Sequence, residues 1–206
     1  MTMQRHVQAA VMAAVMAVGL SAQAQSNDPR QFGVARFEAV QRLVRQPVEA
    51  GSPQAAQREA QVSRLLNGMI DVEELGRRAL DGYWVDRTAP ERTEFVTLLR
   101  QLIERSYRQH IDQTGNFAVT YEPAQRDDAA GTATVRSTAR SRTDARATPV
   151  SIEYRMLRRD TRWVVYDIVT NGSSLVDTYR ESYTRIVRDR GFAELLRRLR
   201  ARVAST

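Results

Sequence analysis

The sequence predicts an α+β domain whose helices pack on one face of an antiparallel sheet. Apolar residues recur at spacings of three and four between residues 32 and 111, which is typical of amphipathic helices. The spacing changes to two between residues 117 and 169, and it returns to three and four after residue 174. We therefore expect N-terminal helices, a four-stranded, mainly antiparallel, twisted sheet and two C-terminal helices.

Four helices are predicted before the sheet. Residues 32–45 form the first, and Ser52 can cap the second with its hydroxyl group. Asp71 can cap a third, short helix in the same way. Thr88 opens the fourth, because Glu91 three residues later can return a hydrogen bond to the Thr88 amide.

The four predicted strands cover residues 117–121, 133–139, 150–156 and 163–169. If Asp160-Thr161 is the tip of the hairpin between the last two, the pairing register of that hairpin follows from the residue count. In this register Met156, Tyr154 and Ile152 lie opposite Val165, Asp167 and Val169. One face of the sheet then becomes strongly apolar and carries a single carboxylate.

Two helices are predicted after the sheet. The polar residues 171–174 break the last strand, and Ser174 can cap a helix that runs to Arg190. Gly191 can adopt the left-handed conformation that ends such a helix. A last, arginine-rich helix follows.

Two stretches of sequence resemble the MlaC family of periplasmic phospholipid-binding proteins, also described as toluene-tolerance auxiliary components of an ABC transport system. One is WVVYDIVTNGSSLVDTYRESYTRIVRDRGF at residues 163–192, and the other combines DVEELGRRALDGYW at 71–84 with TAPERTEF at 88–95. Their order and spacing carry the resemblance, which covers about residues 65–200.

The resemblance implies a carrier that shuttles phospholipid between an outer-membrane lipoprotein/porin complex and an inner-membrane ABC-type lipid transport complex. Such a carrier maintains the lipid asymmetry of the outer membrane and holds phospholipid as cargo, with no cofactor. Burying a CH₂ group contributes about 0.8 kcal/mol, so one sixteen-carbon chain contributes roughly 12 kcal/mol. A carrier must therefore enclose the acyl chains and leave the charged headgroup in water. Periodicity alone does not distinguish such a cavity from a filled core.

Candidate site residues follow from the predicted apolar sheet face and from the fourth helix. We expect the lipid cavity to be lined by Val150, Ile152, Tyr154, Met156, Val165 and Val169, facing Leu98 and Leu102. We expect the helix from Ser174 to Arg190 and the C-terminal arginines to dock on partner complexes through forked hydrogen bonds. The candidate docking arginines are Arg197, Arg198 and Arg200.

The N-terminus predicts secretion. Residues 7–20 are mostly apolar and are followed by Ala22-Gln23-Ala24, a typical cleavage site, so we interpret residues 1–24 as a signal peptide. Fourteen residues span about 21 Å of helix, which is too short for a membrane anchor. We expect residues 25–206 to form a single periplasmic domain with no integral membrane segment. It contains 30 arginines, no lysine and 24 acidic residues, for a net charge of +6.

Other classes of function find little support. The chain has no cysteine, and Asp127-Asp128 is only an adjacent acidic pair, so we expect no metal site. His110 lies one turn after Ser106, but no third catalytic group is evident, so we predict no enzyme. The arginines are interleaved with acids along the whole chain, which argues against nucleic-acid binding. The expected fold, with its helices and sheet enclosing an apolar cavity, resembles nuclear-transport-factor-like and cystatin-like folds. Two alternatives remain for the function: a small enzyme or ligand-binding domain of nuclear-transport-factor-like fold, and a periplasmic adaptor that binds only protein.

Overall fold

The computed structural model describes residues 28–49, 51–114 and 116–205, and for residues 108–114 it describes the backbone alone. The predicted signal peptide, residues 1–24, lies outside the described residues. The described residues form six α-helices, one short 3₁₀-helix and six strands. The helices are α1 (Pro29–Arg45), α2 (Pro53–Met69), α3 (Val72–Leu80), η1 (Asp81–Trp84), α4 (Ala89–Thr114), α5 (Leu175–Arg190) and α6 (Phe192–Ala204). The strands are β1 (Phe117–Tyr121), β2 (Gln125–Asp127), β3 (Thr132–Ser141), β4 (Val150–Arg159), β5 (Arg162–Thr170) and β6 (Ser173–Ser174).

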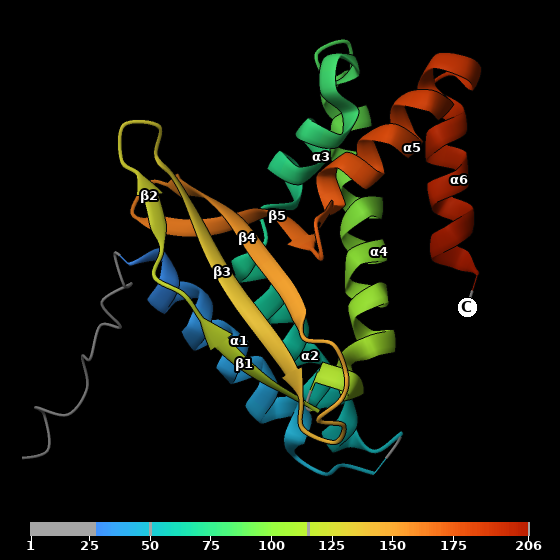
Figure 1. The fold of residues 1–206 in the computed structure, drawn as a ribbon. Coiled ribbons are helices and arrows are strands. Elements are labelled where there is room, and N and C mark those ends of the chain that lie inside the picture. The colour runs from blue at the N-terminus through green and yellow to red at the C-terminus, as the bar shows by residue number, and fades with distance from the viewer. Residues whose placement is uncertain (1–27, 50, 115, 206) are drawn as a thin grey trace, which may run out of the picture.

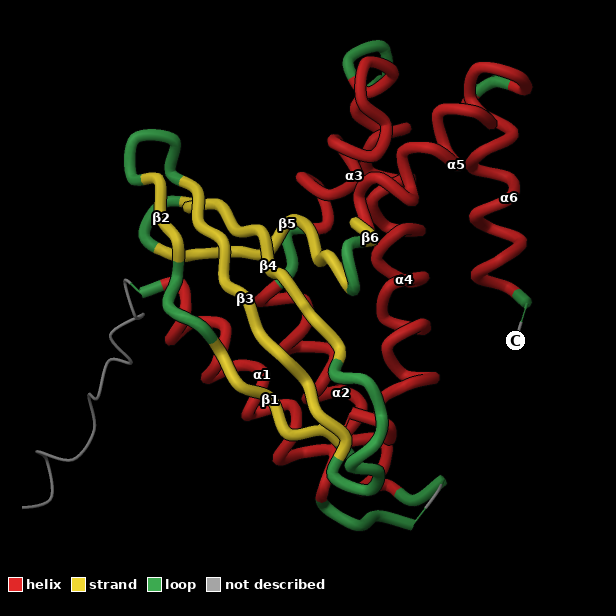
Figure 2. Tube along the Cα trace, in the orientation of Figure 1, coloured by secondary structure: helices red, strands yellow, loops and turns green. Residues whose placement is uncertain are grey.

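The α+β class is confirmed, but the prediction of four strands was wrong. The sheet has the order β1-β3-β4-β5-β6, and β2 pairs with β3 beside β1. The three residues of β2, Gln125, Arg126 and Asp127, are all polar and exposed, so the sequence shows no alternation of apolar and polar side chains there. Strand β6 has two residues and lies beside the end of β5, directly before α5 (Figure 2). Neither strand is long enough to produce a periodic signal.

The helices form two groups around the sheet. Figure 1 shows α1 and α2 crossing one face of the sheet, while α3, α5 and α6 gather with α4 beyond the end of the sheet at β5. The expectation that all helices pack on one sheet face was therefore wrong for the second group. Helix α4 contacts α1 and α2 as well as α3 and α6, so it connects the two groups.

Each group of helices has its own hydrophobic core. The first core joins α3, α4, α5 and α6, and its fully buried residues include Leu75, Phe95 and Leu195. The second core joins the sheet to α1 and α2, around Val62 and Trp163. Ile70, between α2 and α3, packs against both cores.

The predicted helix caps are present. The side chains of Ser52, Asp71 and Ser174 accept hydrogen bonds from the backbone amides three residues later, at 3.1, 2.9 and 3.0 Å. The Thr88 amide donates to the Glu91 carboxylate at 2.8 Å, as a capping box requires. Gly191 adopts a positive φ of 82°, which ends α5.

The predicted register of the β4–β5 hairpin holds only near its tip. Met156 lies opposite Val165, as predicted, but Arg155 rather than Tyr154 lies opposite Asp167. The cause is a β-bulge, in which Tyr166 is an extra residue of β5 without an opposite partner. Tyr154 therefore faces Ile168, and Ile152 faces Thr170 rather than Val169.

Candidate functional site

An apolar cavity lies where the two cores meet. Its volume is about 340 Å³. Both groups of helices and the sheet contribute to its wall, and most of the lining side chains are apolar. The lining residues are Phe37, Leu66, Met69, Ile70, Leu75, Ile103, Ser106, Tyr107, Ile152, Tyr154, Val165, Tyr166, Asp167, Ile168, Thr170, Leu175 and Tyr179.

The sheet side of the cavity is built by alternate residues of β4. Ile152 and Tyr154 point toward the helices because successive side chains of a strand point to opposite faces. The ring of Tyr154 packs on Phe37 of α1, with ring centroids 4.9 Å apart. Burial raises the pKa of Tyr154 far above its ordinary value of 10.0, so its hydroxyl group stays neutral at every physiological pH. The wall thus carries aromatic surface and no charge at this point.

Three of the predicted cavity residues line this cavity, namely Ile152, Tyr154 and Val165. The other five do not. The bulge turns Val169 to the face of its new partner Glu153, away from Ile152. Leu98 and Leu102 are buried in the first core, which joins α3, α4, α5 and α6. Met156 is buried in the second core, which joins the sheet to α1 and α2. Val150 pairs with Ala139 in the sheet, away from the cavity wall.

Sequence reasoning missed the helical part of the wall. Leu66 and Met69 of α2 line it, together with Leu175 and Tyr179 of α5. These residues belong to apolar stripes that the sequence does show. A stripe does not reveal whether its residues meet a filled core or a cavity, because both demand the same spacing.

Asp167 is a buried carboxylate within β5, and its side chain reaches the start of α5. Its side chain is 1% exposed. It accepts hydrogen bonds from the hydroxyl group of Ser174 at 2.8 Å, from the amide of Val176 at 3.0 Å and from Arg155 Nη1 at 3.2 Å. The negative charge is therefore compensated by an arginine and by the N-terminus of α5. Asp167 fixes the start of α5, and with it the cavity residue Leu175.

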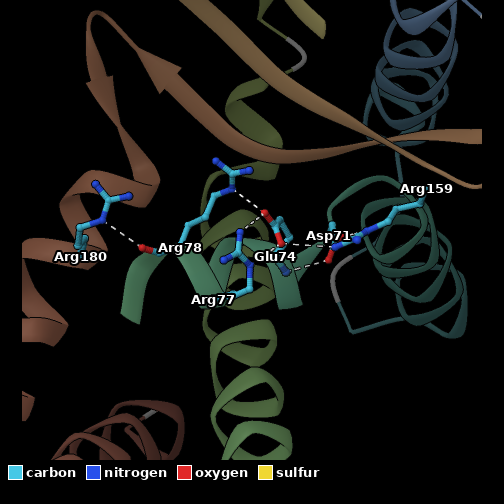
Figure 3. Close-up of polar contacts among 6 residues, drawn as sticks. All are labelled: Asp71, Glu74, Arg77, Arg78, Arg159 and Arg180. Atoms are coloured by element: carbon cyan, nitrogen blue, oxygen red, sulfur yellow. Dashed lines mark hydrogen bonds and ion pairs between the residues drawn. The ribbon is translucent and has the colours of Figure 1, made fainter. Parts of the chain in front are cut away.

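A second charged cluster fastens α3 to the elements around it (Figure 3). Glu74 is nearly buried and accepts two hydrogen bonds of 2.8 Å from Arg77 and one of 2.7 Å from Arg78. Arg159, at the tip of the β4–β5 hairpin, donates to Asp71 at 2.8 Å. The two hydrogen bonds from Arg77 first, and then the one from Arg78, hold the pKa of Glu74 below its ordinary value of 4.5.

The same cluster reaches α5. Arg180 Nε donates to the carbonyl oxygen of Arg78 at 3.1 Å, and the Arg78 guanidinium lies 4.0 Å from the centroid of the Tyr166 ring. Figure 3 shows Arg180 approaching α3 from the opposite side to Arg159. Helix α3 is thereby held between the hairpin and α5. Its residue Leu75 lines the cavity, so this cluster supports one wall.

The predicted docking arginines lie exposed on α6, and each has an acidic partner. Arg197 and Arg198 both donate to Glu194, at 2.6 and 2.7 Å, and Arg200 donates to Glu94 of α4 at 2.6 Å. The hydrogen bonds from Arg197 and Arg198 lower the pKa of Glu194 to about 2. These arginines therefore form ion pairs on the molecular surface.

The described residues contain no group of three or more potential metal ligands from His, Cys, Asp and Glu side chains. The side chain of His110 lies outside this description. Within the described part of the chain, no helix has both the length and the apolar character needed to cross a membrane.

Comparison with known proteins gives two positive results. A protein-family model described as MlaC protein matches residues 36–201. Seven chains of solved structures match, among them a phospholipid-binding protein from Ralstonia solanacearum in complex with a phospholipid. That chain is 22% identical, with a TM-score of 0.73 over 86% of this chain and 97% of its own, so the two share a fold. No curated protein matches this chain.

Proposed function

Because the chain belongs to the MlaC family, we propose that it is a carrier that holds a phospholipid in the apolar cavity between its two cores. The family match includes every residue of the cavity wall. The protein from Ralstonia solanacearum, which shares the fold, was solved with a phospholipid, and this supports the same class of ligand here. In this proposal phospholipid is cargo, and the protein is not an enzyme.

The apolar cavity is the observation that carries the proposal. Its volume of about 340 Å³ lies within the usual range of ligand sites, roughly 300–1,000 Å³. Protein interiors are otherwise packed as densely as organic crystals, so an apolar cavity of this size is a departure from ordinary core packing. An acyl chain would fill the cavity and gain about 0.8 kcal/mol for each buried CH₂ group. The cavity therefore suits a ligand with a long hydrocarbon chain.

We assign the contact with the acyl chains to both sides of the cavity. Ile152, Tyr154 and Val165 provide it from the sheet. Leu66, Met69, Ile103 and Leu175 provide it from α2, α4 and the start of α5. Leu98, Leu102, Val150, Met156 and Val169 are left out of this assignment because they do not line the cavity.

The wider role that we propose is transport across the periplasm. After removal of residues 1–24, residues 25–206 would shuttle phospholipid between an outer-membrane lipoprotein/porin complex and an inner-membrane ABC-type complex, and so maintain outer-membrane asymmetry. Exposing acyl chains to water costs many kcal/mol, so release has to occur while the carrier is docked. N-terminal sequencing of the mature protein should give Gln25 first, and a retained Met1 would contradict the periplasmic assignment.

Lipid extraction from the purified protein tests the proposal against the adaptor alternative. A carrier should yield phospholipid in near-stoichiometric amount by mass spectrometry after size-exclusion chromatography. An adaptor that binds only protein should yield none. A small enzyme or ligand-binding domain should yield a different, water-soluble molecule.

A further inference from the structure

A second cavity, of about 210 Å³, lies between α4, α5 and α6 and differs in character from the first. It is lined by Leu102, Arg105, Ser106, Tyr179, Tyr183, Arg202 and Ser205. Among these described lining residues, two carry guanidinium groups and none carries a carboxylate. The cavity thus offers positive charge and hydroxyl groups to a ligand.

The two cavities adjoin each other. Ser106 of α4 and Tyr179 of α5 line both of them. The apolar cavity offers hydrocarbon surface on one side of these two residues, and the second cavity offers arginines on the other. A molecule with an apolar chain and an anionic end could place its chain in the apolar cavity and its anionic end in the second cavity.

Arg105 is held in place by the last turn of α6. Its Nη1 donates to the carbonyl oxygens of Arg202 at 2.9 Å and of Val203 at 3.3 Å. Carbonyl groups at a helix C-terminus favour such a cation. Both of these bonds engage Nη1, so among the described residues the donors on Nε and Nη2 are left for a ligand. The guanidinium is therefore oriented before any ligand arrives.

Arg202 differs from its neighbours on α6. Arg197, Arg198 and Arg200 each pair with a carboxylate, whereas no carboxylate of the described residues pairs with Arg202. Arg202 lines the second cavity together with Tyr179 and Tyr183, whose stacked rings have centroids 5.1 Å apart. Burial raises the pKa of both phenols, and the charge of Arg202 opposes that rise.

We propose that this second cavity seats the phosphate of the lipid headgroup, with Arg202 and Arg105 as its cationic ligands and the acyl chains extending into the apolar cavity. The inference rests on the proposed function and adds a site to it. Guanidinium groups match phosphate oxygens in charge and in forked geometry. The preferred cargo is therefore a lipid with a phosphate group rather than a neutral lipid with the same chains.

A competition experiment tests this site. Delipidated protein is mixed with vesicles of dioleoyl phosphatidylglycerol doped with dioleoylglycerol and is then re-isolated. Mass spectrometry gives the ratio of the two bound lipids relative to their ratio in the vesicles. The wild type should enrich phosphatidylglycerol at least tenfold. The Arg202→Gln variant should lose about tenfold of that enrichment, the equivalent of one charge-assisted hydrogen bond.

Two further variants control this result. Arg200→Gln removes an arginine from the same helix whose partner is Glu94, outside the cavity, and it should keep the wild-type enrichment. Arg202→Lys keeps the charge but loses the forked donors, so its enrichment should be intermediate. Circular dichroism should show equal helix content in all variants, because Arg202 is exposed on the last turn of α6.

The outcomes separate the site from the proposed function. Equal uptake of both lipids by the wild type and by Arg202→Gln would overturn the headgroup site and leave lipid binding intact. Uptake of neither lipid would overturn the proposed function itself. Inorganic phosphate is the probe for a free-anion site. If it binds the delipidated protein in an Arg202-dependent way while the protein shows no lipid preference, the cavity is a site for free anions and the headgroup assignment is wrong.

Discussion

Ile70 lies opposite Val165 in a single parallel β-bridge, and both residues line the apolar cavity. The next amide, that of Asp71, donates to the carbonyl oxygen of Val165 at 2.8 Å. The turn between α2 and α3 is thus hydrogen-bonded to the middle of β5, where the two hydrophobic cores approach each other. The apolar cavity lies beside this junction, and residues of both cores line it.

Replacing Glu74 with Gln should destabilise the fold at neutral pH. Arg77, Arg78 and Arg159 would then face a neutral amide, and we expect a loss of about 1.5–3 kcal/mol in the free energy of unfolding. The pKa of Glu74 is lower in the folded protein than its ordinary value of 4.5. Its contribution is therefore complete above pH 4.5 and is lost as the pH falls through the lower, folded-state value.

Urea denaturation of the wild type and of Glu74→Gln over a range of pH checks this prediction. The difference between them should be constant at neutral pH and should shrink in acid. Glu59→Gln, at an exposed position on α2, is the matched control and should leave the free energy of unfolding unchanged. A difference between wild type and Glu74→Gln that does not vary with pH would contradict the electrostatic explanation.

Replacing Asp167 with Ala should also destabilise the fold, by about 2–4 kcal/mol. The change leaves the amide of Val176 and the hydroxyl group of Ser174 without their buried acceptor, and unsatisfied groups of this kind are costly. Thermal and urea unfolding measure the loss, with the exposed Asp189→Ala as control. If the two variants are equally stable, the start of α5 does not depend on Asp167.

Reversing the charge of Arg197, Arg198 and Arg200 should slow lipid transfer to the partner complex and leave lipid content unchanged. These residues line an exposed face of α6, away from the apolar cavity. Their effect on association should weaken with salt. Transfer of labelled lipid to partner-containing membranes is the measurement.

A triple reversal of Arg140, Arg142 and Arg146, which lie on the end of β3 and the loop after it, is the control. If the α6 reversals slow transfer no more than this control, α6 is not the docking face.

Local features of this fold could be predicted from the sequence. The caps at Ser52, Asp71 and Ser174 each depend on one side chain and on an amide three residues away, so short-range sequence determines them. The capping box of Thr88 and Glu91 is determined in the same way. The turn at Gly191 follows from the ability of glycine to adopt positive φ.

Features that depend on the pairing register between two strands could not be predicted. Tyr166 looks like an ordinary member of an alternating strand, and only the paired strand reveals it as the extra residue of a bulge. Because of this single residue, Val169 lies on the opposite sheet face from Ile152, and Asp167 pairs with Arg155. The displacement of Leu98 and Leu102 has a different cause. A wide apolar face on α4 serves two cores and two cavities, and the sequence does not divide it among them.

Native mass spectrometry of a cavity-filling variant tests most directly whether the apolar cavity holds the acyl chains. Ile152→Trp adds a large ring at a partly exposed position of the wall. Val85→Trp adds the same ring at a position that is 72% exposed and away from the cavity, so it is the matched control. We predict near-stoichiometric phospholipid in the wild type and in Val85→Trp, and a several-fold loss in Ile152→Trp with an unchanged circular dichroism spectrum. A folded Ile152→Trp protein that carries as much phospholipid as the wild type would show that the chains bind elsewhere.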